Sequence, residues 1–167
     1  MRDPEHIKEV MQLEFSGSEL NVRAALQSLM AGLVGAGLAE DDLGLIELVL
    51  AEVFNNIVEH AYGSGSRGPI FVSAAARAGW LDFRVTDEGR ALPSGALAQG
   101  GLPQLDGPLD SLPEGGFGWY LVRKLAADLS YQRKDGRNRL TFSMPCQADI
   151  CDAGPGAAGG AENLKKT

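Results

Sequence analysis

The chain has 167 residues, of which 44% are hydrophobic, and carries a formal net charge of −7. This length and composition fit one globular domain with a sizeable core. The negative charge argues against a nucleic-acid surface, which needs a basic footprint, and against a polybasic membrane anchor.

The sequence also lacks the usual marks of membrane insertion and secretion. No segment reaches the ~18 apolar residues of a membrane span, and the charged N-terminus has no signal-peptide core. Its two cysteines, Cys146 and Cys151, form neither a disulfide framework nor a zinc-ligand pattern. We therefore expect a cytoplasmic protein with reduced thiols.

The N-terminal part of the chain predicts one strand followed by two helices. Residues 11–15 alternate weakly, as in a short strand. Ser16 or Ser18 can cap a helix over 19–34, which a Gly-Ala-Gly sequence ends. Acidic residues then open a helix over 40–61, where the positive end of the helix dipole favours carboxylates.

A predicted hairpin and a long irregular segment follow. Residues 70–76 and 80–86 read as two strands joined by a short turn that contains glycine. Residues 90–116 are rich in Gly, Pro, Leu and Asp and show no periodicity. Since long loops inside compact domains are uncommon, this segment is interpreted as a functional lid.

The C-terminal part predicts a helix, a hairpin and a tail. The helix covers 117–127, and the two strands cover 129–133 and 140–144. Residues 147–167 are rich in Ala, Gly and Lys and predict a disordered tail, which leaves 1–146 as the domain. Helices and hairpins in separate blocks predict an α+β fold, with helices on one face of a mixed, mostly antiparallel sheet.

Three polar residues form a column on the second predicted helix. Glu52, Asn56 and His60 are spaced four apart, which places them on one helix face. The Asn56 carboxamide oxygen suits Mg²⁺, which prefers oxygen ligands, and Glu52 can take a proton from a hydroxyl or polarise a water. His60 lies near the helix C-terminus, where the dipole favours its protonated form. A solvated polar face explains the column almost as well.

Three further motifs carry candidate chemistry. Asp87 ends a predicted strand and can accept a hydrogen bond from the adenine amine, with Gly89 allowing close backbone approach. Glycines at positions 115, 116 and 118 begin a helix, where N–H groups can face phosphate oxygens. Thr141 lies on the last strand, from which a hydroxyl can reach an adenine-side water. Taken singly, a plain turn, a flexible hinge and an ordinary strand threonine remain open for these motifs.

The order and spacing of these pieces resemble the GHKL ATPase superfamily, whose pattern is Glu-x-x-x-Asn, Asp-x-Gly, a glycine-rich lid and a late strand threonine. Within it, the chain is most similar to the bacterial anti-sigma-factor serine kinases, through Asn-Ile-Val-Glu-His-Ala-Tyr at 56–62, Asp-Glu-Gly-Arg at 87–90 and Gly-Gly-Phe-Gly at 115–118. The resemblance covers about residues 10–145. It implies the two-layer α/β sandwich of the Bergerat type.

The resemblance also implies the two ligands of the site, ATP and Mg²⁺. Asn56 would hold the metal that bridges the phosphates, and Glu52 would be the general base for a protein serine. Asp87 would bind the adenine amine, with Gly89 giving the ring room. Thr141 would support the adenine end of the site.

For the remaining motif residues the resemblance implies contacts with the phosphates. The glycines 115, 116 and 118 would lie along them, and His60 has a structural or a phosphate-side role. One departure is Ala91, which replaces the second glycine of the family's Asp-x-Gly-x-Gly motif. A second is the absence of Arg or Lys between Arg90 and the glycine cluster, which leaves phosphate neutralisation to the metal, backbone N–H groups, Arg90 or Arg123.

Two functions follow as hypotheses. The first is an ATP-dependent protein serine kinase and anti-sigma factor, which binds a sigma factor and phosphorylates a STAS-domain antagonist. The second is a non-catalytic module that regulates a sigma factor or another partner by binding alone. A homodimer is expected from the resemblance, and a sensor histidine kinase fragment is disfavoured because neither His6 nor His60 lies in a dimerisation segment.

Overall fold

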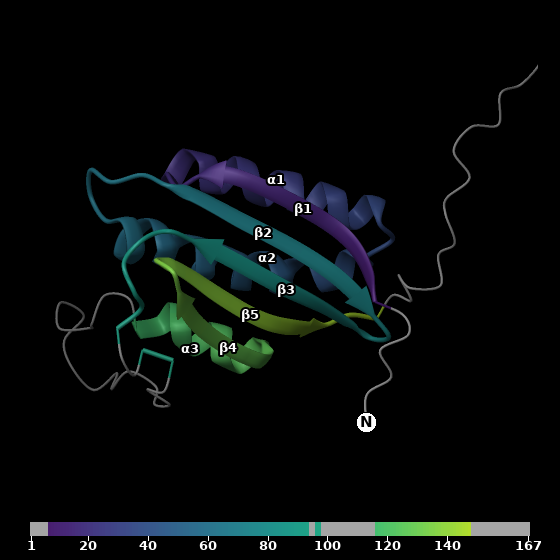
Figure 1. Ribbon diagram of the computed structural model, residues 1–167. Helices are drawn as coiled ribbons and strands as arrows, with labels where there is room; N and C mark the ends of the chain where they lie inside the picture. The colour runs from purple at the N-terminus through teal and green to yellow at the C-terminus, as the bar shows by residue number, and fades with distance from the viewer. Residues whose placement is uncertain (1–6, 94–95, 98–115, 148–167) are drawn as a thin grey trace, which may run out of the picture.

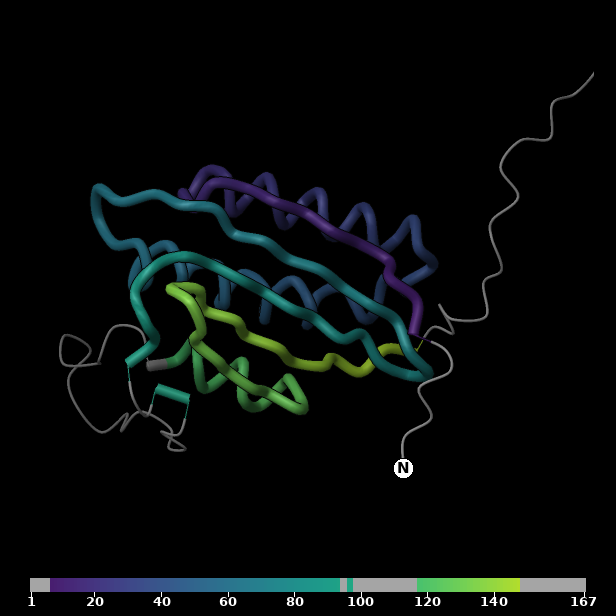
Figure 2. The backbone as a smooth tube through the Cα atoms, viewed as in Figure 1, coloured from purple at the N-terminus to yellow at the C-terminus, as the bar shows by residue number. Residues whose placement is uncertain are grey.

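The computed structural model describes residues 7–93, 96–97 and 116–147, and its elements form two layers. One layer is a five-stranded sheet in the order β1-β2-β3-β5-β4, and α1 and α2 cover one of its faces (Figure 1). Figure 2 shows the two long helices running behind the strands. The elements in chain order are β1 (Lys8–Ser16), α1 (Glu19–Gly35), α2 (Glu40–Asn56), η1 (Ile57–Tyr62), β2 (Pro69–Arg77), β3 (Trp80–Asp87), α3 (Gly116–Leu125), β4 (Ala127–Lys134) and β5 (Arg137–Pro145).

This architecture confirms the predicted two-layer α+β fold, with two differences of detail. Every strand pairing in the described sheet is antiparallel, whereas a mixed, mostly antiparallel sheet was expected. The helix predicted over 40–61 is α-helical only to Asn56 and continues as a π-helix, η1. Most of the predicted lid and nearly all of the predicted tail lie outside the described residues.

The helices begin where the sequence provides capping chemistry. The Ser18 side chain accepts a hydrogen bond from the Asn21 backbone N–H at 3.3 Å, which caps α1. Helix α2 has no side-chain cap, but its first turn contains Glu40, Asp41 and Asp42, which interact favourably with the helix dipole. No helix in the described part of the chain is long and apolar enough to cross a membrane.

The core forms between the helices and the inner face of the sheet. On β3, Leu81, Phe83 and Val85 are buried because alternate residues of a strand point to the same face. Phe83 stacks on Phe142 of β5, with ring centroids 5.3 Å apart. The same alternation carries Asp87, the last residue of β3, towards the helices, so that a carboxylate ends an otherwise apolar row.

Candidate nucleotide-binding site

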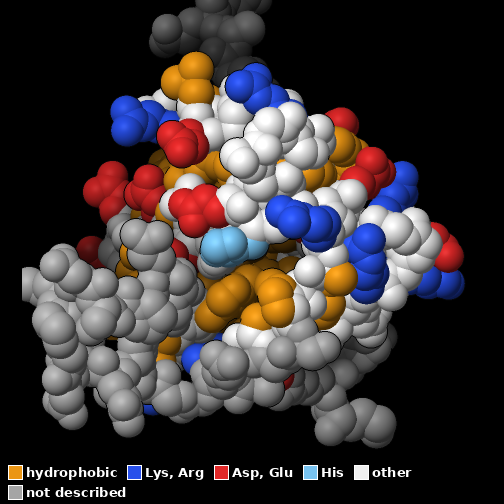
Figure 3. Space-filling view, turned by 90° about the vertical axis from the view of Figure 1, so that its left-hand side faces the viewer, with side chains coloured by type: hydrophobic (Ala, Val, Ile, Leu, Met, Phe, Trp, Pro, Cys, Tyr) orange, Lys and Arg blue, Asp and Glu red, His pale blue; other side chains and the backbone are white. Residues whose placement is uncertain are grey.

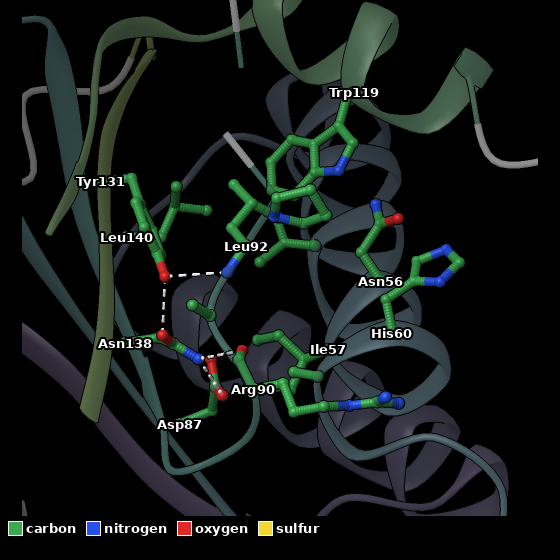
Figure 4. A pocket seen from close by; sticks show the side chains of 14 residues that line it. Asn56, Ile57, His60, Asp87, Arg90, Leu92, Trp119, Tyr131, Asn138 and Leu140 are labelled. Carbon is green, nitrogen blue, oxygen red and sulfur yellow. Dashed lines mark hydrogen bonds between the residues drawn. The ribbon is translucent and has the colours of Figure 1, made fainter. Parts of the chain in front are cut away.

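A pocket lies where the end of the sheet meets α2, η1 and α3 (Figure 4). The cavity that its side chains enclose is about 40 Å³, and the space measures about 440 Å³ when the open solvent at its mouth is included. Figure 3 shows hydrophobic side chains gathered in a hollow on this side of the molecule, with acidic side chains on one side of it and basic ones on the other. The lining residues are Val53, Asn56, Ile57, His60, Ala61, Asp87, Arg90, Ala91, Leu92, Pro93, Trp119, Tyr131, Asn138 and Leu140.

Asp87 is a buried hydrogen-bond acceptor in this pocket, with only 5% of its surface exposed. Its Oδ1 atom accepts the Gly89 backbone N–H at 2.9 Å and the Asn138 side-chain amide at 2.8 Å. Both bonds end on Oδ1, and among the described residues no bond reaches Oδ2. The second oxygen is therefore available to a ligand with an amino donor, as the adenine prediction requires.

Burial controls the ionisation of Asp87. Desolvation raises the pKa of its carboxyl above the ordinary value, because burial disfavours the charged form. The hydrogen bonds from Asn138 and Gly89 oppose this rise, and so does the nearby charge of Arg133. These neighbours thus favour the ionised form, which is an acceptor at both oxygens.

Asn138 links Asp87 to the rest of the pocket, and its own exposure is only 4%. Its Oδ1 accepts from the Tyr131 hydroxyl at 2.7 Å and from the Arg133 guanidinium at 2.6 Å. Its Nδ2 donates to Asp87 and to the Arg90 backbone carbonyl, both at 2.8 Å. The Tyr131 hydroxyl also accepts the Leu92 N–H at 2.9 Å, so one network joins β3, β4, β5 and residues 90–92 (Figure 4).

Thr141, predicted at the adenine end, does not reach this pocket. Leu140 and Phe142 face the core, so Thr141 between them points to the opposite face of the sheet. There it lines an open groove together with Arg84 and Ser143. Asn138, three residues earlier, takes the position that was assigned to the threonine. The alternation of apolar residues on the last strand was the signal that could have found it.

Position 89 needs a glycine because the backbone there lies against Ala61 of η1. A Cβ atom at this position would lie 2.6 Å from the carbonyl carbon and the Cβ of Ala61. The Arg90 N–H donates to the Ala61 carbonyl at 2.8 Å directly beside this contact. The close approach of Gly89 to the end of η1 therefore fixes how β3 leaves the sheet, and Gly89 itself is outside the pocket lining.

The π-helix η1 orients the residues that follow Asn56. The Gly63 N–H donates to the Val58 carbonyl at 3.0 Å, which is the five-residue spacing of a π-helix. At its end, the Tyr62 hydroxyl donates to the Pro69 carbonyl at 2.7 Å and accepts the Glu88 N–H at 3.0 Å. Burial raises the pKa of the Tyr62 hydroxyl, so it remains a neutral donor. Tyr62 thereby joins η1, β2 and the end of β3.

Asn56 is held so that its oxygen is free. Its Nδ2 atom donates to the Glu52 backbone carbonyl at 2.8 Å. The amide is buried and lines the pocket, and its Oδ1 has no hydrogen bond within the described residues. Because Mg²⁺ prefers oxygen ligands and keeps water and phosphate ligands of its own, this free oxygen and the nearby Glu52 carboxylate fit the predicted metal. No cluster of three or more His, Cys, Asp or Glu suited to a metal occurs in the described ranges.

The glycine cluster is described only in part. Gly115 lies outside the described residues, and Gly116 begins α3. Gly118 lies against the column on α2, because a Cβ at this position would collide with the Glu52 carboxylate and come within 3.2 Å of Asn56 Nδ2. The structure therefore brings Glu52, Asn56 and Gly118 together, as the sequence predicts for a phosphate-side wall.

His60 and Arg90 lie at the open side of the pocket. The His60 side chain is 53% exposed, and its Nε2 is 3.8 Å from the Glu59 carboxylate. The exposed Arg90 guanidinium lies beside Gly63 and has no ion pair within the described residues. Arg123 instead donates to the backbone carbonyls of residues 96 and 97. Arg90 is thus the described arginine that lines the pocket with a free charge.

A two-layer fold with a buried carboxylate facing an Asn-bearing helix defines an ATPase domain of the GHKL type. The chain belongs to the histidine kinase-like ATPase domain family, which it matches over residues 15–144. This confirms the family predicted from the motifs.

Relatives of known name agree with this assignment. The chain is 35% identical over 99 residues to the serine/threonine-protein kinase BtrW of Bordetella bronchiseptica, covering 59% of this chain and 67% of that protein. It is 30% identical over 119 residues to the serine-protein kinase RsbW of Bacillus mycoides, covering 70% and 74%.

A solved structure shows the same fold. It contains the RsbU and RsbW domains of Rv1364c from Mycobacterium tuberculosis, and the TM-score is 0.54 at 20% identity. The match covers 81% of this chain and 32% of that longer chain.

Proposed function

We propose that this protein is an ATP-dependent protein serine kinase that also acts as an anti-sigma factor in a partner-switching system. The observation that carries the proposal is the arrangement of Glu52 and Asn56 on α2 opposite Asp87 on β3. The Asn56 amide and the Asp87 carboxylate both line the pocket, and the Glu52 carboxylate lies beside Asn56, next to Gly118. The similarity to proteins named as serine-protein kinases supports the reaction class.

We assign different residues of the site to different parts of the nucleotide. Asp87 Oδ2 accepts the adenine amine, and the apolar side chains of Ile57, Leu92 and Trp119 surround the base. Asn56 offers its Oδ1 to Mg²⁺, which when bound neutralises phosphate charge and orients the phosphates. The exposed Arg90 guanidinium, from a residue that also lines the pocket, would add positive charge for the phosphates.

Glu52 gives the site its reactive group. In the proposed transfer, the Glu52 carboxylate removes the proton from a serine hydroxyl of the protein substrate. The serine oxygen forms a bond to the γ-phosphorus, while the bond from that phosphorus to the β,γ-bridging oxygen breaks and leaves ADP. The product is a phosphoserine, which adds negative charge to the substrate.

The proposed substrate is a STAS-domain antagonist, and the proposed target of inhibition is a sigma factor. Added phosphate charge at the interface would weaken the complex with the antagonist and leave the kinase to bind the sigma factor. A homodimer is also proposed for the kinase, on the basis of the family resemblance. Each of these partners is a separate prediction that co-purification can test.

The experiment measures phosphoserine formation with Mg-ATP and a cognate STAS protein. We expect Glu52→Gln to retain ATP binding and to lose about 10²–10⁴-fold in transfer rate, the usual contribution of a general base. Glu47→Gln is the matched control, since Glu47 is an exposed residue on the same helix. If the wild-type chain binds ATP and transfers no phosphate, the kinase proposal fails and the non-catalytic binding module replaces it.

A further inference from the structure

The orientation of the Asn138 amide is fixed by its neighbours. Its Oδ1 accepts from the Arg133 guanidinium, which can only donate, and from the Tyr131 hydroxyl. The amide nitrogen must therefore face Asp87 and the Arg90 carbonyl. A rotated amide would place an oxygen against two acceptors.

This fixed donor determines what Asp87 can bind. With the Asn138 and Gly89 N–H groups both on Oδ1, this oxygen cannot carry a proton without losing a donor. Oδ2 is the atom left for a ligand, and it accepts from that ligand in the ionised form of Asp87, which the Asn138 and Gly89 donors on Oδ1 favour. A purine with an amino group at carbon 6 donates to such an atom, whereas a purine with an oxo group there presents a second acceptor and is repelled.

We propose that Asn138 is a positioning residue that gives this pocket its preference for a 6-amino over a 6-oxo purine nucleotide. It acts through Asp87 and does not itself contact the base. The inference rests on the proposed binding of ATP, and it adds the residue that sets the selectivity. Tyr131 and Arg133 support it, since each donates to the Asn138 Oδ1 atom.

The same residue also holds the wall of the pocket. Asn138 donates to the Arg90 carbonyl, and through Tyr131 it is connected to the Leu92 N–H. Residues 90–93 line the pocket beside Asp87. A change at Asn138 that only loosened this wall would weaken 6-amino and 6-oxo nucleotides equally. A change that acted through Asp87 would alter their ratio, so the ratio is the diagnostic quantity.

The test measures the dissociation constants of Mg-ATP and Mg-ITP for the full chain by calorimetry. ITP differs from ATP in carrying the 6-oxo group. We expect the wild type to prefer ATP by about 100-fold or more, because a buried polar site rejects a mispaired ligand strongly. Asn138→Leu should reduce the ratio by at least about tenfold, since Asp87 loses its fixed donor.

Two further variants keep the test decisive. Ser143→Ala, on the same strand and also buried, is the control and should leave the ratio unchanged. If Asn138→Leu does not fold, Tyr131→Phe decides, because it removes one donor to Asn138 and should lower the ratio about threefold. An unchanged ratio of the ATP and ITP dissociation constants in Asn138→Leu, or in Tyr131→Phe if Asn138→Leu does not fold, overturns the inference. A wild type that selects ATP but transfers no phosphate instead contradicts the kinase proposal alone.

Discussion

Gly118 of α3 lies so close to the Glu52 carboxylate of α2 that a Cβ atom at position 118 would displace this carboxylate. The contact joins a helix that begins at the glycine cluster to the proposed catalytic base. It also explains why an otherwise helical segment keeps a residue that disfavours helices. A substitution at Gly118 can therefore move the Glu52 carboxylate without weakening α3.

Gly118→Ala should reduce phosphoserine transfer by at least about tenfold, because the new methyl group displaces the Glu52 carboxylate. The helix itself should not be weakened, since alanine is favoured over glycine by about 1 kcal/mol in helices. Transfer rate and thermal unfolding together check this. Gly44→Ala is the control, because Gly44 lies on α2 with open space around its Cβ position. Equal transfer rates for the two variants would refute the role of the contact.

Asn56→Ala should abolish the magnesium dependence of ATP binding. The substitution removes the only side-chain oxygen of Asn56, and the loss should weaken Mg-ATP at least about tenfold while metal-free ATP changes little. Titration with and without Mg²⁺ measures both values. Asn55→Ala is matched in residue type and position, since Asn55 is exposed on the same helix. A similar loss in both variants, or the same loss without metal, would contradict a metal-binding role.

The sequence was sufficient to predict the elements because apolar alternation and helical spacing act locally. It also singled out Asn56 and Asp87, which line one pocket, and Glu52, which lies beside Asn56 but outside the pocket lining, since the family pattern contains their order. Asn138 was missed because its role depends on a partner 51 residues away, which only the pairing of β3 with β5 reveals. Thr141 was assigned to the site although the alternation of its own strand places it on the other face.

The helix predicted over 40–61 shows a second limit of sequence patterns. An α-helix and a π-helix bury nearly the same apolar residues over one turn, so Ile57 and Tyr62 did not distinguish them. The outcome depends on where the Tyr62 hydroxyl finds partners, namely the Pro69 carbonyl and the Glu88 N–H. Those partners belong to strands that come later in the chain. Tertiary contacts therefore decided the local geometry of this segment.

Tyr62→Phe should destabilise the fold by about 1–3 kcal/mol, because both backbone partners of the hydroxyl are left unsatisfied. The ring itself remains and keeps its packing, so the effect isolates the two hydrogen bonds. Urea denaturation measures the change. Tyr120→Phe is the control, since the Lys124 ammonium lies over the Tyr120 ring, which phenylalanine retains. If both variants unfold alike, the bridge between η1 and β3 does not stabilise the domain.

Asp87→Asn should stabilise the domain at neutral pH while removing ATP binding. Burial raises the pKa of Asp87 above its ordinary value of 3.8, so the folded protein is stabilised relative to the unfolded chain below that pH. This contribution is lost as the pH rises through the raised pKa, because the folded state must then hold a desolvated charge. Asparagine does not titrate, so the variant lacks this loss. Its free energy of unfolding should therefore rise relative to that of the wild type from acidic to neutral pH.

ATP binding should fall for a different reason, since the new amide nitrogen would face the adenine amine with a donor against a donor. Urea denaturation across the pH range and calorimetry with Mg-ATP measure the two effects on the same variant. Asp82→Asn is the control, because Asp82 lies outside this pocket and forms an ion pair with Arg77, which the substitution removes. A stability difference between Asp87→Asn and the wild type that does not change with pH would show that burial of this carboxylate carries no cost. In that case, the balance of desolvation and hydrogen bonds at Asp87 would not explain why its carboxylate is an acceptor.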